Sequence, residues 1–348
     1  MSPPSTADLV EGDDLDGLLV RIDHLCADGE WEGVVDLRDR CLRAFSERGR
    51  QLWPASSHAQ YRLALEAPGR WAATVLTPDT GKFSLGPLAE VAASTHTWAE
   101  LAPHVPATPE ATLAAHERVV RGEDLTGDDR VDRGVLELPL LLQPWEPFYP
   151  LANYRPHEAV FPDLPPPPLE TVTLPEPGLP VDDPEGGRAL VELASVWKRE
   201  SNGEAAAAAV AGDALSAIAA VGGVGGAEGG AGSTAAREGG AGSTARIGAV
   251  AADQALATMA WAAASGGAHG RRRGMAAGRF AAWWAVAALA GLLDDWPFVP
   301  DEVGEAATGM RWYRWDDGAP ATGWSLCLAV EDPEAGWAWA VRAADRRD

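Results

Sequence analysis

Lysine is scarce in this 348-residue chain, which carries only Lys82 and Lys198 among its 28 basic residues. Asp and Glu together number 51, so the formal net charge is −23. A surface of this sign repels polyanions, and neutralising a phosphate backbone needs clustered Lys and Arg. We therefore expect the protein to bind neither nucleic acid nor an anionic membrane.

Cysteine is nearly absent, and its three positions, Cys26, Cys41 and Cys327, form no C-x-x-C pair. This excludes a disulfide framework, a zinc ribbon and a thioredoxin-like redox motif. The histidines also lack metal-ligand spacing, since "HERVV" at His116 and "HEAVF" at His157 each miss the second histidine of a zinc helix. The other histidines considered lie scattered along expected helices: His24, His58, His96 and His104.

Sequence motifs for catalysis are missing as well. The chain has no G-x-S-x-G elbow and no G-x-x-x-x-G-K-[ST] phosphate loop. We therefore predict no catalytic residue, no metal ligand and no cofactor.

Long apolar runs are also lacking. The longest, from Phe280 to Leu293, has 14 residues, whereas a membrane helix needs about 20. The N-terminal "MSPPSTADLVEGDDLDGLL" has neither the basic start nor the apolar core of a signal peptide. These features favour a cytoplasmic protein.

What the chain does contain is enough apolar residue, 46%, to build real cores, and its length favours two domains. Residues 15–48 show apolar positions at helical spacing on both sides of "ADGEW", which predicts a helical hairpin. "ADGEWEGVVDLRDRCLRAF" resembles the second half of a tetratricopeptide-type helical pair over about one unit, without a second copy. An ordinary helical hairpin is the alternative.

Further short helical patterns, broken by prolines, follow up to about residue 121. This spacing predicts a stacked-helix, solenoid-like domain over residues 1–138. From Pro139 to Pro184 the chain holds fourteen of its 27 prolines. Because proline fixes φ and removes a donor, we expect residues 139–182 to form an extended strap or linker. Its aromatic residues favour packing on a domain surface, and a ligand for a proline-recognition module is the alternative.

Residues 183–348 are rich in Ala and Trp and predict a helical C-terminal domain. Alanine-rich helices are expected at 183–221 and 246–264, and a final helix is expected to begin at Asp332. The duplicated "EGGAGSTA" indicates a flexible Gly-rich loop over 222–246, because no expected strand precedes its G-x-G-x-x-A turns. Only 310–331 reads as a β-hairpin. The predicted fold class is therefore mainly α, with a small β-hairpin.

Nine of the fifteen tryptophans lie between Trp261 and Trp339. Their helical and alternating spacing favours packing in a core, and an exposed cluster that binds sugars is the alternative.

One window combines glycine and positive charge. "SGGAHGRRRGMAAGRFAAWW", Ser265 to Trp284, lies in a stretch without any Asp or Glu between Asp253 and Asp294. We expect a helix to start near Arg271, with Arg271, Arg272 and Arg273 in its first turn, where backbone N–H groups already favour anions. His269 precedes this turn and Arg279 follows Arg272 by seven positions, so residues 266–279 form the candidate site.

Four interpretations of this site remain open. The arginines pair with the chain's own carboxylates, with an acidic surface of a partner protein, with a small phosphate or carboxylate ligand, or, last, they serve catalysis. We expect a non-catalytic scaffold or adaptor that acts through protein–protein contacts. The alternative is an enzyme or sensor that binds a small anionic ligand at 266–279.

Overall fold

The chain folds into two compact units in the computed structural model, which describes residues 4–224, 242–318 and 323–346. The first, here called the helical unit, comprises Met1–Leu141 and Leu151–Pro162. The second, the sheet unit, comprises Leu142–Pro150 and Asp163–Asp348. The expected strap 139–182 is thus divided between the two units.

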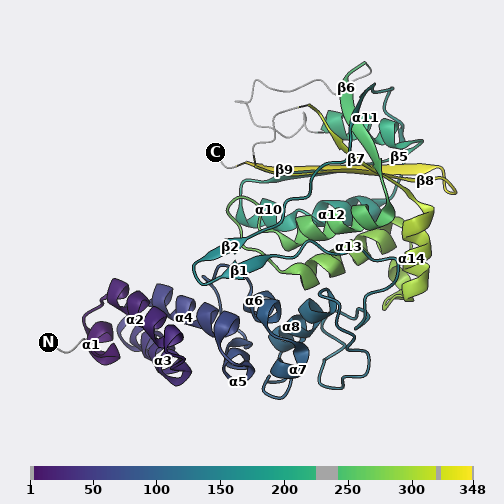
Figure 1. Cartoon of the computed structure of the whole chain (residues 1–348). Coiled ribbons are helices and arrows are strands. Elements are labelled where there is room, and N and C mark those ends of the chain that lie inside the picture. The colour runs from purple at the N-terminus through teal and green to yellow at the C-terminus, as the bar shows by residue number, and fades with distance from the viewer. Residues whose placement is uncertain (1–3, 225–241, 319–322, 347–348) are drawn as a thin grey trace. The chain divides into compact units, whose positions relative to one another are not determined.

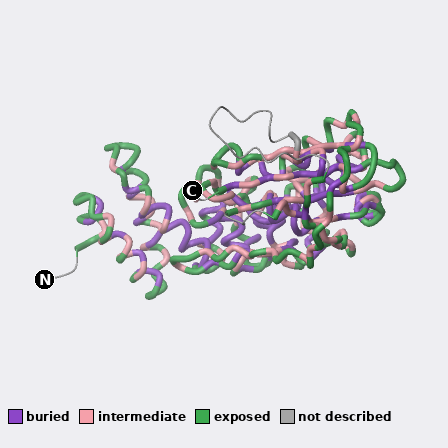
Figure 2. The backbone as a smooth tube through the Cα atoms, turned by 90° about the horizontal axis from the view of Figure 1, so that it is seen from above, coloured by how far each residue is buried: buried purple, intermediate pink, exposed green. Residues whose placement is uncertain are grey.

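The helical unit is built from short helices and one 3-10 turn. Their bounds are α1 Thr6–Glu11, α2 Leu15–Ala27, α3 Trp31–Arg48, α4 Trp53–Glu66, α5 Gly69–Ala72, η1 Ala73–Val75, α6 Leu88–Thr95, α7 Trp98–Leu101 and α8 Pro109–Val119. The hairpin predicted over 15–48 is α2 and α3. Ile22 of α2 and Leu37 of α3 are fully buried, while the opposite faces are exposed (Figure 2). Helix α3 ends at Arg48 and is capped by Gly49, whose φ of 66° is a conformation that glycine adopts freely.

A two-stranded hairpin completes the helical unit. Strands β1 (Asn153–Arg155) and β2 (Glu158–Val160) pair antiparallel, with Tyr154 opposite Ala159. The Tyr61 hydroxyl of α4 donates to the carbonyl oxygen of Arg155 at 2.6 Å. The Tyr154 hydroxyl donates to the buried Glu90 of α6 at 2.6 Å. The hairpin is therefore held against the helices by hydrogen bonds to α4 and α6.

The sheet unit is organised around a seven-stranded antiparallel sheet of order β3-β6-β7-β8-β9-β5-β4. The strands are β3 Glu170–Thr173, β4 Leu179–Pro180, β5 Glu204–Ala211, β6 Thr244–Val250, β7 Arg311–Asp316, β8 Gly323–Asp332 and β9 Trp337–Arg346. β8 and β9 form the longest ladder, from Gly323 opposite Arg346 to Asp332 opposite Trp337.

Helices cover both faces of this sheet (Figure 1). They are α9 Pro184–Glu192, α10 Ser195–Glu200, α11 Ala214–Val224, α12 Ala252–Ala264, α13 Met275–Leu289 and α14 Pro300–Gly309, with the 3-10 turn η2 Leu293–Asp295. Helix α11 packs on the face that carries Val210, Trp315 and Ala340. Helices α10, α12 and α13 lie on the opposite face (Figure 1).

The structure contradicts the predicted fold class. Of the residues that the structure describes, 46% are helical and 17% lie in strands, so the fold is mixed α and β rather than mainly α. The expected hairpin within 310–331 corresponds to β7 and β8, but these are two neighbours in a sheet of seven strands.

The alanine run "EAAAAAVA" forms strand β5, although its composition predicts a helix. Ala205 lies opposite Ala343 and Ala208 opposite Ala340 of β9. Alanine has the best intrinsic helix propensity, but propensity is a weak prior that tertiary pairing overrides. Here β9 and β4 supply the backbone hydrogen-bond partners that an isolated helix would have supplied itself.

Two other helical predictions fail for the same reason. Residues 244–250 form strand β6 before helix α12 starts at Ala252. The expected C-terminal helix is a turn followed by β9, in which Trp339 and Val341 of the alternating "WAWAVRA" are buried. That alternation is the signature of a strand. The expected Gly-rich loop 222–246 lies mostly outside the described residues.

Within the residues that the structure describes, none of the helices has the length and apolar character that a bilayer crossing demands.

The contribution of the sheet core can be tested by replacing Leu328, whose exposed fraction is 1%, with alanine. A buried Leu→Ala change removes apolar contact and leaves a cavity, so the free energy of unfolding should fall by about 2–5 kcal/mol. Leu179→Ala, a change in the same unit at a side chain that is 78% exposed, is the matched control and should cost less than about 0.5 kcal/mol. The free energy of unfolding can be measured by urea unfolding followed by circular dichroism. Equal losses in the two variants would contradict a core role for Leu328.

Candidate functional site

The arginine window forms a loop between α12 and α13. Helix α12 ends at Ala264, and α13 begins at Met275 rather than near Arg271. Its N-cap is Gly274, whose φ of 92° is a backbone conformation that would be strained for a residue with a side chain. Arg271, Arg272 and Arg273 therefore precede the helix and do not occupy its first turn.

Carboxylates of the same unit hold this loop. Asp345, which is fully buried, accepts hydrogen bonds from the backbone N–H of Ala268 at 2.6 Å and from the Ser201 hydroxyl at 2.9 Å. The backbone N–H of His269 donates to the Ser201 hydroxyl oxygen at 3.2 Å. Gly267 permits this approach, because a Cβ there would lie 2.1 Å from Asp345 Oδ2.

Glu200 is the acidic partner of the loop arginines. It forms an ion pair with the Arg273 guanidinium and accepts the backbone N–H of Arg271 at 3.1 Å. Arg271 and Arg272 make further contacts within the chain. The guanidinium of Arg273 is thus paired with a carboxylate of the same chain.

Arg279 lies in a different environment from the loop arginines. Its side chain and that of Glu146 are both fully buried and form a bidentate ion pair. Arg279 Nε donates to Glu146 Oε2 and Arg279 Nη2 donates to Glu146 Oε1, both at 2.7 Å. Glu146 also accepts hydrogen bonds from the Tyr149 hydroxyl at 2.6 Å and from Trp283 Nε1 at 3.0 Å. Such a satisfied network is the condition under which a buried ion pair is tolerated.

The pKa of Glu146 reflects this network. Burial alone would raise it, but hydrogen bonds and the charge of Arg279 outweigh burial and hold the pKa below its usual value. The sequence-predicted site residues therefore divide into a solvent-facing loop, His269 and Arg271–Arg273, and a buried structural node at Arg279.

A second surface feature begins at Phe280, the residue after Arg279. We call it the aromatic–acidic surface. Phe280 and Trp284 lie one turn apart on α13, and Trp296 and Phe298 follow η2. The ring centroids of Trp284 and Trp296 are 5.3 Å apart, and those of Trp296 and Phe298 are 4.5 Å apart at nearly right angles. All four rings are only half-buried.

Five exposed carboxylates lie close to Trp296 and Phe298 in the sequence: Asp294, Asp295, Asp301, Glu302 and Glu305. Phe280 to Met310 contains no Lys, Arg or His. In the described part of the chain none of the five carboxylates forms an ion pair. The surface therefore combines apolar ring area with unbalanced negative charge.

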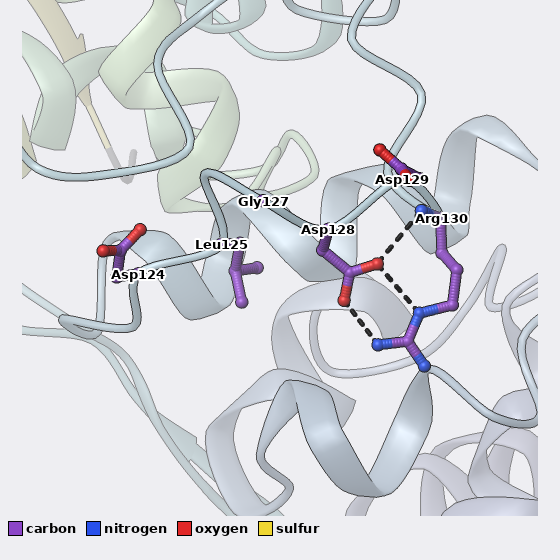
Figure 3. A pocket seen from close by; sticks show the side chains of 6 residues that line it. All are labelled: Asp124, Leu125, Gly127, Asp128, Asp129 and Arg130. Carbon is purple, nitrogen blue, oxygen red and sulfur yellow. Dashed lines mark hydrogen bonds and ion pairs between the residues drawn. The ribbon is translucent and has the colours of Figure 1, made fainter.

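A shallow hollow of about 500 Å³ lies over residues 124–130 of the helical unit (Figure 3). Asp128 at its centre accepts hydrogen bonds from Arg130 Nε at 2.8 Å and from Trp98 Nε1 at 2.9 Å. Hydrogen bonds from Arg130 hold the pKa of Asp128 well below its usual value. Because one loop supplies the whole lining and its central acid is already engaged, we do not take this hollow as a ligand site.

The structure also brings together residues that no spacing in the sequence indicates. His58 of α4, His157 of the β1–β2 turn and Asp23 of α2 place their ligand atoms within 4.8 Å of one another. Local sequence carries no signal for this group, because its members are up to 134 positions apart.

The buried pair can be tested with Glu146→Gln, which leaves Arg279 buried and uncompensated. The free energy of unfolding at pH 7 should fall by about 3–5 kcal/mol. Because the folded-state pKa of Glu146 is depressed, its contribution is complete above the unfolded pKa of about 4.3 and is lost as the pH falls through the folded pKa. The stability gap between wild type and variant should therefore narrow on acidification below about pH 4.3.

Glu302→Gln, at an exposed acid without an ion pair, is the control and should change stability by less than about 0.5 kcal/mol at pH 7. A gap between wild type and Glu146→Gln that stayed constant from pH 7 to pH 3 would contradict an ionised Glu146.

Comparison with known proteins yields one relationship. Neither a curated protein nor a solved structure matches the chain. The profile of one family, described as "Family of unknown function (DUF6183)", matches residues 16–346, which is nearly the whole chain. The protein therefore belongs to the DUF6183 family.

Proposed function

We propose that this protein is a non-catalytic adaptor that docks a basic polypeptide segment on the aromatic–acidic surface. The observation that supports this most directly is the combination of four half-buried rings in mutual contact with exposed carboxylates that have no cationic partner among the described residues. A partner rich in arginine or lysine would satisfy both features at once.

The rings supply the short-range part of the binding. The outward area of Trp284, Trp296 and Phe298 is apolar, and aromatic faces attract guanidinium and ammonium groups. Each such cation–π contact is worth about 0.5–1 kcal/mol at an exposed site and more when water is excluded. Phe280 and Trp284 stand on α13, whose buried face packs in the sheet unit, so the helix positions these two rings before a partner arrives.

The carboxylates supply the long-range part. A chain of net charge −23 attracts a basic partner, and unpaired acids beside the rings orient it. The sign of this partner is opposite to the acidic surface expected from the arginine window. The reason is that Glu200 and Glu146 already pair with Arg273 and Arg279.

The alternative function, binding of a small phosphate or carboxylate at 266–279, has weaker support. An anion at the loop would have to compete with Glu200 for Arg273. Arg279 is fully buried and forms a bidentate ion pair with Glu146. It could reach a ligand only by leaving the buried Glu146 carboxylate uncompensated. We therefore favour the adaptor.

Binding can be measured by fluorescence polarisation with a labelled peptide of alternating arginine and glycine. Neutralising the surface with Asp294→Asn, Asp295→Asn, Asp301→Asn and Glu302→Gln should weaken binding at least about tenfold, or about 1.4 kcal/mol. Trp296→Leu, which keeps an apolar side chain but removes the ring, should weaken it about fivefold.

The matched control removes the same charge from exposed acids of the helical unit: Asp16→Asn, Asp28→Asn, Glu30→Gln and Glu32→Gln. It should change binding by less than about twofold, because none of these four acids belongs to the aromatic–acidic surface. Equal losses in both quadruple variants, or equal binding of an aspartate–glycine peptide, would refute the proposed surface.

A further inference from the structure

Three potential metal ligands converge in the helical unit. His157 Nε2 lies 3.5 Å from Asp23 Oδ1, and His58 Nε2 lies 3.8 Å from the same oxygen. The two imidazole rings are stacked, with centroids 5.4 Å apart and planes 19° from parallel. Both histidines thus present Nε2 towards a single carboxylate.

These distances are too long for direct hydrogen bonds, which span about 2.7–3.2 Å. They are close to the separation of about 3.4 Å between two ligand atoms that share a tetrahedral ion with bonds near 2.1 Å. With all three atoms within 4.8 Å of one another, a point equidistant from them lies within about 2.4 Å of each, so shifts of a few tenths of an ångström would give bonding distances.

The surrounding structure positions the ligands. Tyr61 lies three residues after His58 on α4, and its hydrogen bond to the Arg155 carbonyl holds the turn that carries His157.

Arg62 is a nearby cation that would oppose a metal. Its guanidinium contacts Asp23 Oδ1 and also pairs with Glu66, from Nε to Oε2 at 2.8 Å. Glu66 balances the charge of Arg62, so an ion that takes Asp23 Oδ1 leaves the guanidinium with a partner. Side-chain exposures of 40% for Asp23 and 64% for His157 leave one side of the group open to water.

We propose that Asp23, His58 and His157 bind one divalent transition-metal ion of the zinc class, with at least one coordination position left to water. Two imidazoles and one carboxylate favour zinc, cobalt, nickel or copper over magnesium and calcium, which prefer all-oxygen sites. Three protein ligands and an open position are the arrangement of zinc sites that bind a water or substrate. The ion would also tie the β1–β2 turn to α2 and α4.

The test uses the full chain without a polyhistidine tag, stripped with EDTA and dialysed. Titration with ZnSO₄ in a calorimeter should show one ion per chain with a Kd in the micromolar range or tighter, and excess Zn²⁺ should raise the Tm. Co²⁺ should give the visible absorption of a low-symmetry, four- or five-coordinate site.

His157→Ala should weaken Zn²⁺ binding at least tenfold, and because this side chain is exposed the fold should persist. Asp23→Asn should weaken it as well, with Tm of the metal-free protein reporting any loss of fold. His104→Ala, at another exposed histidine of the helical unit, is the matched control and should leave the Kd unchanged. Absence of saturable binding to the wild type, or equal loss in His157→Ala and His104→Ala, would overturn the proposal.

Discussion

The buried ion pair between Glu146 and Arg279 is the interaction that anchors helix α13 in the sheet unit. It joins residues 142–150, a short segment between two parts of the helical unit, to α13 of the sheet unit. Two buried charges are tolerated only when their hydrogen bonds are satisfied, and here the carboxylate accepts from Arg279, Tyr149 and Trp283. Helix α13 is fixed in this way, and its next turns carry Phe280 and Trp284.

Ion pairs of this kind also shape the distribution of charge around the candidate site. Apart from two lysines, the Lys and Arg residues of the chain are all arginine, and the planar guanidinium group suits bidentate pairing with carboxylates. Glu146 and Glu200 engage Arg279 and Arg273 within the sheet unit. These two arginines are thereby engaged within the chain. The charged residues from Phe280 to Met310 are all acidic. This charge distribution is the basis for proposing a basic partner rather than an anionic one.

The helical unit shows how a chemical site can arise without a motif. Metal-binding motifs are recognised when ligands are close in sequence, as on one helix or in one loop. Asp23, His58 and His157 instead come from two helices and a turn, and Tyr61 and Tyr154 hold that turn in place through hydrogen bonds. Each histidine lacks a neighbouring ligand in the sequence, so no local pattern indicates the group. Only the packing of the hairpin on α4 pairs their rings.

The sequence by itself determined the features that depend on local chemistry. The helical hairpin of α2 and α3 followed from apolar spacing over residues 15–48, and the strands β7 and β8 followed from alternation and turn residues. The tertiary structure alone decided that the alanines of β5 are a strand, that α13 starts after the arginines, and which carboxylate meets which arginine. Local propensity weighs each segment against water, whereas a strand and an ion pair gain their free energy from partners far away in the chain, which no local pattern records.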